Sequence, residues 1–237
     1  MIKKIVTLLL VAYWGFAGVQ ISVALEKDDS YWKEYHYGDP DIIITPESEF
    51  TFNAGTGTIT GYSGTNATVV IPYEIGGVSV VTIGTYAFGM VSTLRNVTTP
   101  FSVKTVGDGA FAESFSLNTV DFRGVETIES YGLYQTAVVT LSIPCVTSIG
   151  DHALEHMFSL TGVNFSGSPP SFGVNLYTDA PSVTNYVPST ATGWGDTFGG
   201  RPVVRISPPV GTVVKLCGTC TSLESGGTGV RITVAAE

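Results

Sequence analysis

A pattern of seven mostly apolar positions recurs four times along the middle of the chain, at spacings of 21 to 23 residues. A fixed period of this length is typical of a solenoid, in which each repeat forms one coil and buries its apolar face against its neighbours. We call these positions the apolar ladder. Its four copies are Val80, Ile83, Ala87, Phe88, Leu94, Val97 and Thr99; Val103, Val106, Ala110, Phe111, Leu117, Val120 and Phe122; Val125, Ile128, Gly132, Leu133, Val138, Leu141 and Ile143; and Val146, Ile149, Ala153, Leu154, Leu160, Val163 and Phe165.

Two kinds of element are predicted within each repeat. The pattern Leu-x-x-Val-x-Phe at the end of a copy alternates with period two, which predicts a short strand with its apolar side chains inside. The segment before it, residues 107–117 in the second copy, is too short for an isolated helix, so we expect a helical or 3-10 turn held by packing. Gly84, Gly107 and Gly150 follow a ladder Ile or Val, and we expect a positive φ there. The predicted fold class is an α/β solenoid, predominantly β, capped at both ends.

The N-terminus has the features of a secretory signal. Lys3 and Lys4 precede an apolar run, and Ser22 to Ala24 supply the small residues that signal peptidase requires. Because that run is shorter than the roughly 20 residues that cross a bilayer, we favour cleavage after Ala24 over an anchor helix, and expect no membrane span in the mature chain. The predicted organisation is a signal peptide (1–24), an N-terminal arm (25–49), a cap with an incomplete repeat (50–79), four repeats (80–102, 103–124, 125–145 and 146–166), a C-terminal capping segment (167–206) and a tail or β appendage (207–237).

Composition narrows the range of partners and cofactors. The chain has 20 acidic and 11 basic residues, a formal net charge of −9, which argues against nucleic acid because phosphates require clustered positive charge. Three cysteines are too few for a disulfide framework, but Cys217 and Cys220 form a C-x-x-C pair that we interpret as a local structural disulfide. No phosphate-binding loop or nucleophile motif is present, and we expect no cofactor.

One motif resembles a metal site. His152, Glu155 and His156 match H-x-x-E-H, a zinc-protease pattern in which two histidines one helical turn apart bind the metal. Alignment of the repeats places the two histidines at the positions of Gly109 and Glu113, which vary between copies. We therefore interpret them as solvated surface side chains and keep a zinc hydrolase only as a remote alternative.

The predicted strands carry small polar residues on their outer side. Stacked strands would present these residues as one continuous concave strip, a platform suited to a protein or glycan ligand; a merely solvated face is the alternative. We call this set the polar strip. Its members are Asn96, Thr98, Thr119, Asp121, Thr140, Ser142 and Asn164.

The repeats resemble those of a known family. The units VKTVGDGAFAESFSLNTVDF (residues 103–122) and VTSIGDHALEHMFSLTGVNF (residues 146–165) are similar to the BspA-type leucine-rich repeat, V-x-x-I-G-x-x-A-F followed by L-x-x-V-x-I-P. The resemblance extends over residues 50–206, and GWGDTFGGRP is similar to the piece that often closes such arrays. It implies a secreted or cell-surface, adhesin-like protein that binds an extracellular protein or glycan without catalysis. A structural protein of a cell-surface layer is the other interpretation.

Overall fold

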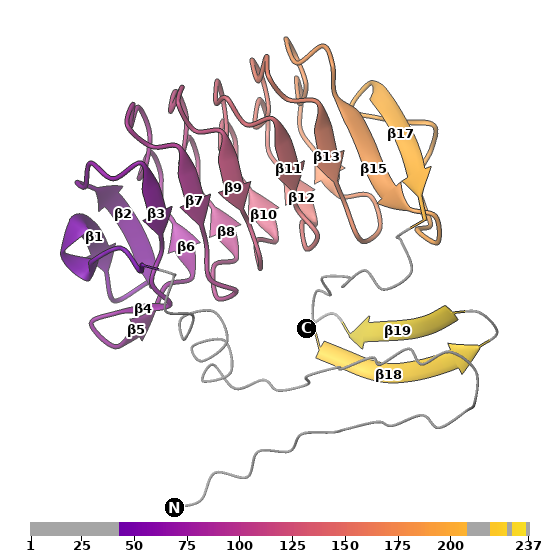
Figure 1. Cartoon of the computed structure of the whole chain (residues 1–237), viewed down its shortest axis with the longest axis horizontal. Coiled ribbons are helices and arrows are strands. Elements are labelled where there is room, and N and C mark those ends of the chain that lie inside the picture. Colours follow the sequence, from indigo (N-terminus) through magenta and orange to yellow (C-terminus); the bar gives the residue numbers. More distant parts are fainter. Residues whose placement is uncertain (1–42, 208–218, 227–228, 236–237) are drawn as a thin grey trace, which may run out of the picture. The chain divides into compact units, whose positions relative to one another are not determined.

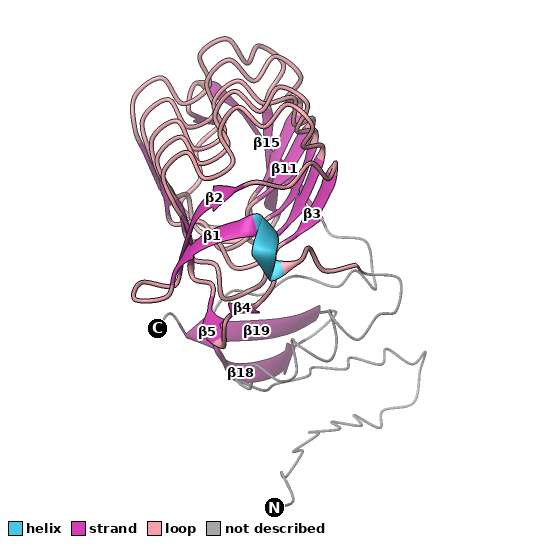
Figure 2. Ribbon diagram, turned by 90° about the vertical axis from the view of Figure 1, so that its left-hand side faces the viewer, coloured by secondary structure: helices cyan, strands magenta, loops and turns pink. Residues whose placement is uncertain are grey.

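The structure is a computed structural model that describes residues 43–207 and the backbone of residues 219–226 and 229–235. These belong to two units, one containing residues 43–207 and the other the C-terminal residues, and each is described by itself. The larger unit is a succession of similar coils, drawn from left to right in chain order in Figure 1 and seen from its N-terminal end in Figure 2. The predicted β solenoid is therefore confirmed.

Each coil contributes one short strand to each of two parallel sheets. The first sheet contains, in order, β1 (Phe50–Asn53), β2 (Thr58–Tyr62), β6 (Thr82–Ile83), β8 (Thr105–Val106), β10 (Thr127–Ile128), β12 (Ser148–Ile149) and β14 (Ser171–Phe172). The second sheet contains β16 (Thr197–Phe198), β17 (Arg201–Ile206), β15 (Thr184–Pro188), β13 (Gly162–Asn164), β11 (Thr140–Ser142), β9 (Thr119–Asp121), β7 (Asn96–Thr98) and β3 (Thr68–Val70). Strands β1 and β16 lie antiparallel to their neighbours.

The core lies between these two sheets. Every residue of the apolar ladder is buried, including the small Gly132 and the polar Thr99. The strands predicted from the Leu-x-x-Val-x-Phe pattern are the strands of the second sheet, with Val120 inside and its two neighbours facing outward. The spacing of apolar residues was thus sufficient to identify the coils and the inner side of each strand.

The two-residue strands that the repeats contribute to the first sheet were not predicted. In the four repeats a Thr or Ser is followed by an Ile or Val, and these pairs are in register, with Thr82 opposite Thr105 and Ile83 opposite Val106. A two-residue strand is too short to show a period of its own. It is defined only by the neighbouring coils that flank it, so the sequence of one repeat gives no sign of it.

The segment between the two strands of a coil is a chain of turns, and the predicted helical or 3-10 turn is wrong. Ala110 N–H donates to the Gly107 carbonyl at 3.0 Å and Ala112 N–H to the Gly109 carbonyl at 2.8 Å. Gly109 and Glu113 have φ of 58° and 59°, and residues with positive φ cannot continue a right-handed helix. In the described residues the one helix is η1 (Glu47–Glu49), outside the repeats.

Neighbouring turn segments bond to one another through the backbone. From the second coil to the third, Gly109 N–H donates to the Ser130 carbonyl at 2.9 Å and Phe111 N–H to the Gly132 carbonyl at 3.0 Å. The same alternate positions bond in the first three coils, and the fourth coil has the outer two bonds, from His152 to Val174 and from His156 to Thr178. Figure 2 shows the segments as a row of nested loops. Backbone groups that a helix would pair internally therefore pair between coils.

The glycines after the ladder Ile or Val have a different purpose from the one we predicted. Gly84, Gly107 and Gly150 do not have positive φ. Instead, a Cβ on Gly107 would lie 2.8 Å from the Ile83 carbonyl oxygen, and one on Gly150 would lie 2.5 Å from the Ser130 nitrogen. These glycines allow the backbones of successive coils to approach one another.

Aromatic side chains close the N-terminal end of the core. The ring of Phe88 stacks on Phe111 at 5.1 Å on one side and on Tyr62 at 5.1 Å on the other, and Phe50 lies at its edge. Strand β1 covers β2, and a small antiparallel hairpin, β4 (Glu74–Ile75) with β5 (Val78–Ser79), follows β3. The first coil thus obtains the apolar neighbour that a preceding repeat would otherwise supply.

The predicted C-terminal capping segment begins with a further coil. Strands β14 and β15 continue the two sheets in register, and the closing residues 189–206 follow. Trp194 and Phe198 pack on Phe165 at 4.9 and 5.4 Å, and the Trp194 indole donates to the Gly167 carbonyl at 2.9 Å. This aromatic group covers the last apolar positions of the core.

Asn185 links this last coil to the closing strands. It is fully buried in the column of core positions that holds Val163 in the preceding coil. Its amide donates to the carbonyls of Phe198, Arg201 and Pro202 at 3.1 to 3.3 Å, and its oxygen accepts a 2.8 Å bond from the Tyr177 hydroxyl. Burial raises the pKa of Tyr177, which keeps that hydroxyl a donor.

The second unit contains an antiparallel hairpin of β18 (Thr219–Gly226) and β19 (Gly229–Ala235), within the segment predicted to be a tail or β appendage. The predicted signal peptide (1–24) and most of the predicted arm (25–49) lie outside the described residues. Among the described helices, none is long and apolar enough to cross a membrane.

Candidate binding surface

The structure brings the residues of the polar strip together on the outer face of the second sheet. Strands β7, β9, β11 and β13 are parallel and in register, so their outward residues form two columns. Asn96 lies opposite Thr119 in one column, and Thr98 lies opposite Asp121 in the other. Neighbouring strands in a sheet are about 4.8 Å apart, so the columns offer polar groups at that spacing, except at Gly162, which has no side chain. Whether the strip binds a ligand stays a prediction.

The strip offers hydrogen-bonding groups and little charge. Asp121 is its one ionisable residue, and its carboxylate pairs with Arg123 Nε at 2.8 Å. Asn96 donates to the Thr68 hydroxyl at 3.1 Å, which continues the strip onto strand β3. Hydroxyls and amides both donate and accept, so the surface suits a neutral polar ligand.

The strip is longer than the sequence indicated, because the coils at both ends add to it. Thr184 lies opposite Gly162, and Tyr186 lies opposite Asn164. A Cβ on Gly162 would meet the Tyr186 ring at 3.0 Å, so this ring leans over the glycine. Thr68, Thr184 and Tyr186 were missed because their coils lack a full ladder, although the alternation of Val69 and Ile71 could have identified Thr68.

The two histidines of the H-x-x-E-H motif lie on the turn segment of the fourth coil, with φ of 58° at His152 and 56° at His156. His152 Nδ1 is 2.6 Å from Glu155 Oε2, and its ring stacks on Tyr131 of the preceding coil at 4.8 Å. His156 Nδ1 lies 3.0 Å from Asp179 Oδ2 of the following coil, a close ion-pair distance without the direction of a hydrogen bond. The two side chains are packed and partnered, not freely solvated as we predicted.

This arrangement does not support a zinc site. The motif needs a helix to place both histidines on one metal, whereas residues 151–156 form turns. In the described part of the chain, no three His, Cys, Asp or Glu side chains gather where they could bind a metal ion. Burial, with the nearby Glu155 carboxylate, raises the pKa of Tyr134, so this side chain stays neutral. The centre of its ring lies 5.3 Å from the centre of the His156 ring.

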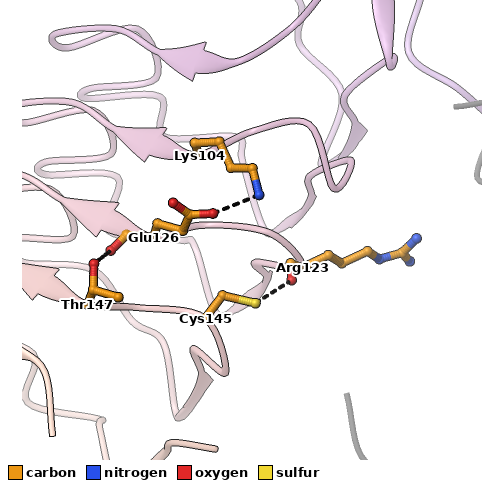
Figure 3. Close-up of polar contacts among 5 residues, drawn as sticks. All are labelled: Lys104, Arg123, Glu126, Cys145 and Thr147. Atoms are coloured by element: carbon orange, nitrogen blue, oxygen red, sulfur yellow. Dashed lines mark hydrogen bonds and ion pairs between the residues drawn. The ribbon is translucent and has the colours of Figure 1, made fainter. Parts of the chain in front are cut away.

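Polar contacts link successive coils at the residues just before strands β8, β10 and β12 of the first sheet (Figure 3). Lys104 Nζ lies 2.8 Å from Glu126 Oε1, and the Thr147 hydroxyl donates to the Glu126 carbonyl at 3.2 Å. Both charged side chains are about half exposed, so the pair contributes little to stability. These contacts align neighbouring coils and form no reactive group.

Cys145 is disulfide-bonded, and its Sγ lies 3.5 Å from the Arg123 carbonyl oxygen (Figure 3). The predicted Cys217–Cys220 disulfide lies outside the residues whose side chains are described and stays a prediction.

With this geometry established, the class of protein is clear. Residues 68–184 match the model of the BspA type leucine rich repeat region, in six copies. The chain is a leucine-rich-repeat protein and belongs to the BspA-type family, as the ladder and the fold both indicate. None of the curated proteins matches the sequence.

Three solved structures are similar to this chain, and the first of them shows the same fold. The leucine rich repeat protein TpLRR of T. pallidum is 23% identical, with a TM-score of 0.57 over 70% of this chain and 82% of that one. The pneumococcal vaccine antigen PcpA is 15% identical over 67% of this chain and 46% of that one, with a TM-score of 0.49. A leucine rich cell surface protein of Faecalibacterium prausnitzii is 17% identical over 72% and 78%, with a TM-score of 0.31.

Proposed function

We propose that this chain is a secreted or cell-surface protein that binds an extracellular protein or glycan through the polar strip, without catalysis. The observation that carries the proposal is the register of the second sheet, which aligns the outward polar residues of strands β7, β9, β11 and β13 into two columns, interrupted at Gly162. Repeat proteins of this kind bind partners along such extended faces.

The chemistry of the strip supports a polar ligand. Asn96, Asn164 and the hydroxyl residues between them supply donors and acceptors at regular spacing, and the Tyr186 ring adds an apolar surface at one end. An aromatic ring with a polar tip is common where one surface must meet both apolar and polar groups of a partner. The location outside the cell is supported by the Lys3–Lys4 and Ser22–Ala24 signals at the N-terminus.

The test places positive charge in the strip. The immobilised chain is probed with a panel of purified matrix proteins, such as collagen, fibronectin and laminin, and with a glycan array. We expect at least one probe to bind, and the triple variant Asn96→Lys, Asp121→Lys, Asn164→Lys to lose that binding at least tenfold, because three bulky cations replace small polar groups.

A control variant changes the net charge by the same amount on the other sheet. Glu126→Lys, Thr147→Lys and Ser171→Lys alter exposed residues near the first sheet and should leave binding unchanged. Equal loss in both triple variants would point to non-specific charge effects, and unchanged binding in the strip variant would refute the strip as the binding site.

A further inference from the structure

The turn segments form a third ladder of backbone hydrogen bonds, beside the two sheets, and it has a direction. Phe88 N–H donates to the Ala110 carbonyl at 2.8 Å, Phe111 N–H to Gly132 at 3.0 Å, and Leu133 N–H to the Ala153 carbonyl at 3.0 Å. Every such bond runs from one coil to the next coil toward the C-terminus. The ladder must therefore end in donors at its last coil and in acceptors at its first.

The donor end is found in the fifth coil. The N–H groups of Asn175, Tyr177 and Asp179 are equivalent to the donors of the earlier coils, and they have no acceptor among the described residues. Asn175 and Asp179 both have φ of 55°, so this turn has the same geometry as the turns before it. Asn175 and Asp179 are exposed while Tyr177 is buried, which leaves the outer two donors accessible.

A shallow hollow with a volume of about 740 Å³ lies along this edge. It is lined by Asp151, by residues 172–178 and by the closing turn at residues 199–201. Phe172 and Val174 are 47% and 61% exposed there, so apolar surface adjoins the free donors. Unpaired backbone groups next to exposed apolar side chains are the features of an edge that takes up another segment.

The acceptor end is found in the first coil. Its carbonyls at Thr85, Ala87 and Gly89 accept no hydrogen bond from the described residues, whereas Asp108 and Ala110 of the second coil do. We call residues 84–90 the acceptor edge and residues 173–179 the donor edge. The second sheet differs, because Thr45 N–H covers its first strand by bonding to Val70, and β17 closes its other end.

The geometry of the donor edge selects its occupant. An extended peptide rises about 3.3 Å per residue and cannot follow a segment in which alternate donors stand at positive φ. A turn segment of the same repeat matches the spacing of these donors, as the backbone hydrogen bonds between successive coils, from the first to the fifth, demonstrate.

We propose that the donor edge of one copy of this chain docks on the acceptor edge of a second copy, head to tail. Such a contact joins two different surfaces and does not close on itself, so it would build short filaments. The contact is small, and each copy carries a net charge of −9, so association should be weak and should strengthen as salt screens the repulsion. A filament of this kind would give the surface-layer interpretation a physical basis.

Three variants at one repeat position test the proposal. Thr85, Ser130 and Val174 each come directly after the first residue of a turn segment, in the first, third and fifth coils. Thr85→Arg obstructs the acceptor edge and Val174→Arg the donor edge, while Ser130→Arg changes a coil that is bonded on both sides. The weight-average mass of the full chain is measured by analytical ultracentrifugation across a wide concentration range, at low and high salt.

We expect the mass of the unsubstituted chain and of Ser130→Arg to rise with concentration, more at high salt. Thr85→Arg and Val174→Arg should each stay monomeric alone, and their mixture should form dimers and nothing larger, because each supplies the edge that the other lacks. Monomers at every concentration of the unsubstituted chain, or a mixture that fails to dimerise, would overturn the proposal. Circular dichroism verifies folding, and Thr85→Glu with Val174→Glu replaces any variant that fails to fold.

Discussion

The inner and outer sides of the second-sheet strands differ in what determines them. Val120 is buried between the sheets, and Thr119, one residue earlier, faces solvent. The inner residues vary little in character because each must fill the same space between neighbouring coils, whereas the outer residues are free of that requirement. The inner residues therefore determine the fold, and the outer residues determine any partner that the strip binds. A shift of one residue in the register would exchange the inner and outer residues.

The largest effect should come from breaking the inner side. Phe111 is fully buried and stacks on Phe88 at 5.1 Å and against Phe122 at 5.9 Å. We expect Phe111→Ala to lower the free energy of unfolding by about 3–5 kcal/mol, because it leaves a cavity that the flanking coils share. Chemical denaturation measures the loss, and hydrogen exchange should show weaker protection in both adjacent coils.

Phe115 is the matched control, since it belongs to the same coil but is 60% exposed. Phe115→Ala should change the free energy of unfolding by about 0.5 kcal/mol or less. A loss below about 1 kcal/mol for Phe111→Ala would contradict the stacked core.

A smaller effect should follow from removing the one amide within a core column. Asn185→Ala would leave the Tyr177 hydroxyl and the carbonyls of the closing strands without their partner. We expect a loss of about 1–3 kcal/mol, the cost of buried groups left unpaired. Asn164→Ala on the adjacent strand, half-exposed, should cost about 0.5 kcal/mol or less, and equal losses in thermal melts would show that burial of Asn185 is not what matters.

The comparison also explains which parts of the fold could be predicted. The ladder identified the coils and the strands of the second sheet, because apolar spacing reports directly on which side chains face the core. It could not report the turn geometry, where Gly109, Glu113 and His152 share a positive φ although their side chains have nothing in common. That conformation is imposed by hydrogen bonds between coils, which no single repeat reveals.

The same limit applies to the candidate site. The strip residues of the four complete repeats were predicted, since alternation fixes the outer face once the inner face is known. Tyr186 was missed because Asn185 replaces the expected apolar residue in its coil and hides the pattern. The histidines were predicted to be solvated, but contacts with Tyr131 and Asp179, which depend on how neighbouring coils align, leave them only partly exposed.

The smallest effect on stability at neutral pH concerns Tyr62, whose side chain is partly buried in the core and partly exposed. Its ring stacks on Phe88 and its hydroxyl donates to Glu49 Oε2 at 3.1 Å; burial, then this bond, raises its pKa to about 12. The folded state thus favours the neutral phenol. Its contribution is complete below the unfolded pKa of about 10 and is lost as the pH rises through about 12.

Tyr62→Phe cannot ionise, so between these two pH values it should lose less stability than the unsubstituted chain, as measured by urea denaturation at a series of alkaline pH values. Glu49→Gln removes the neighbouring charge but leaves the ring buried, so its alkaline loss should lie between those of the other two proteins. Identical pH profiles for all three proteins would show that the Tyr62 hydroxyl is exposed to solvent, as the strip residues are. A smaller loss of stability at alkaline pH in Tyr62→Phe would show that the Tyr62 hydroxyl is buried with the core.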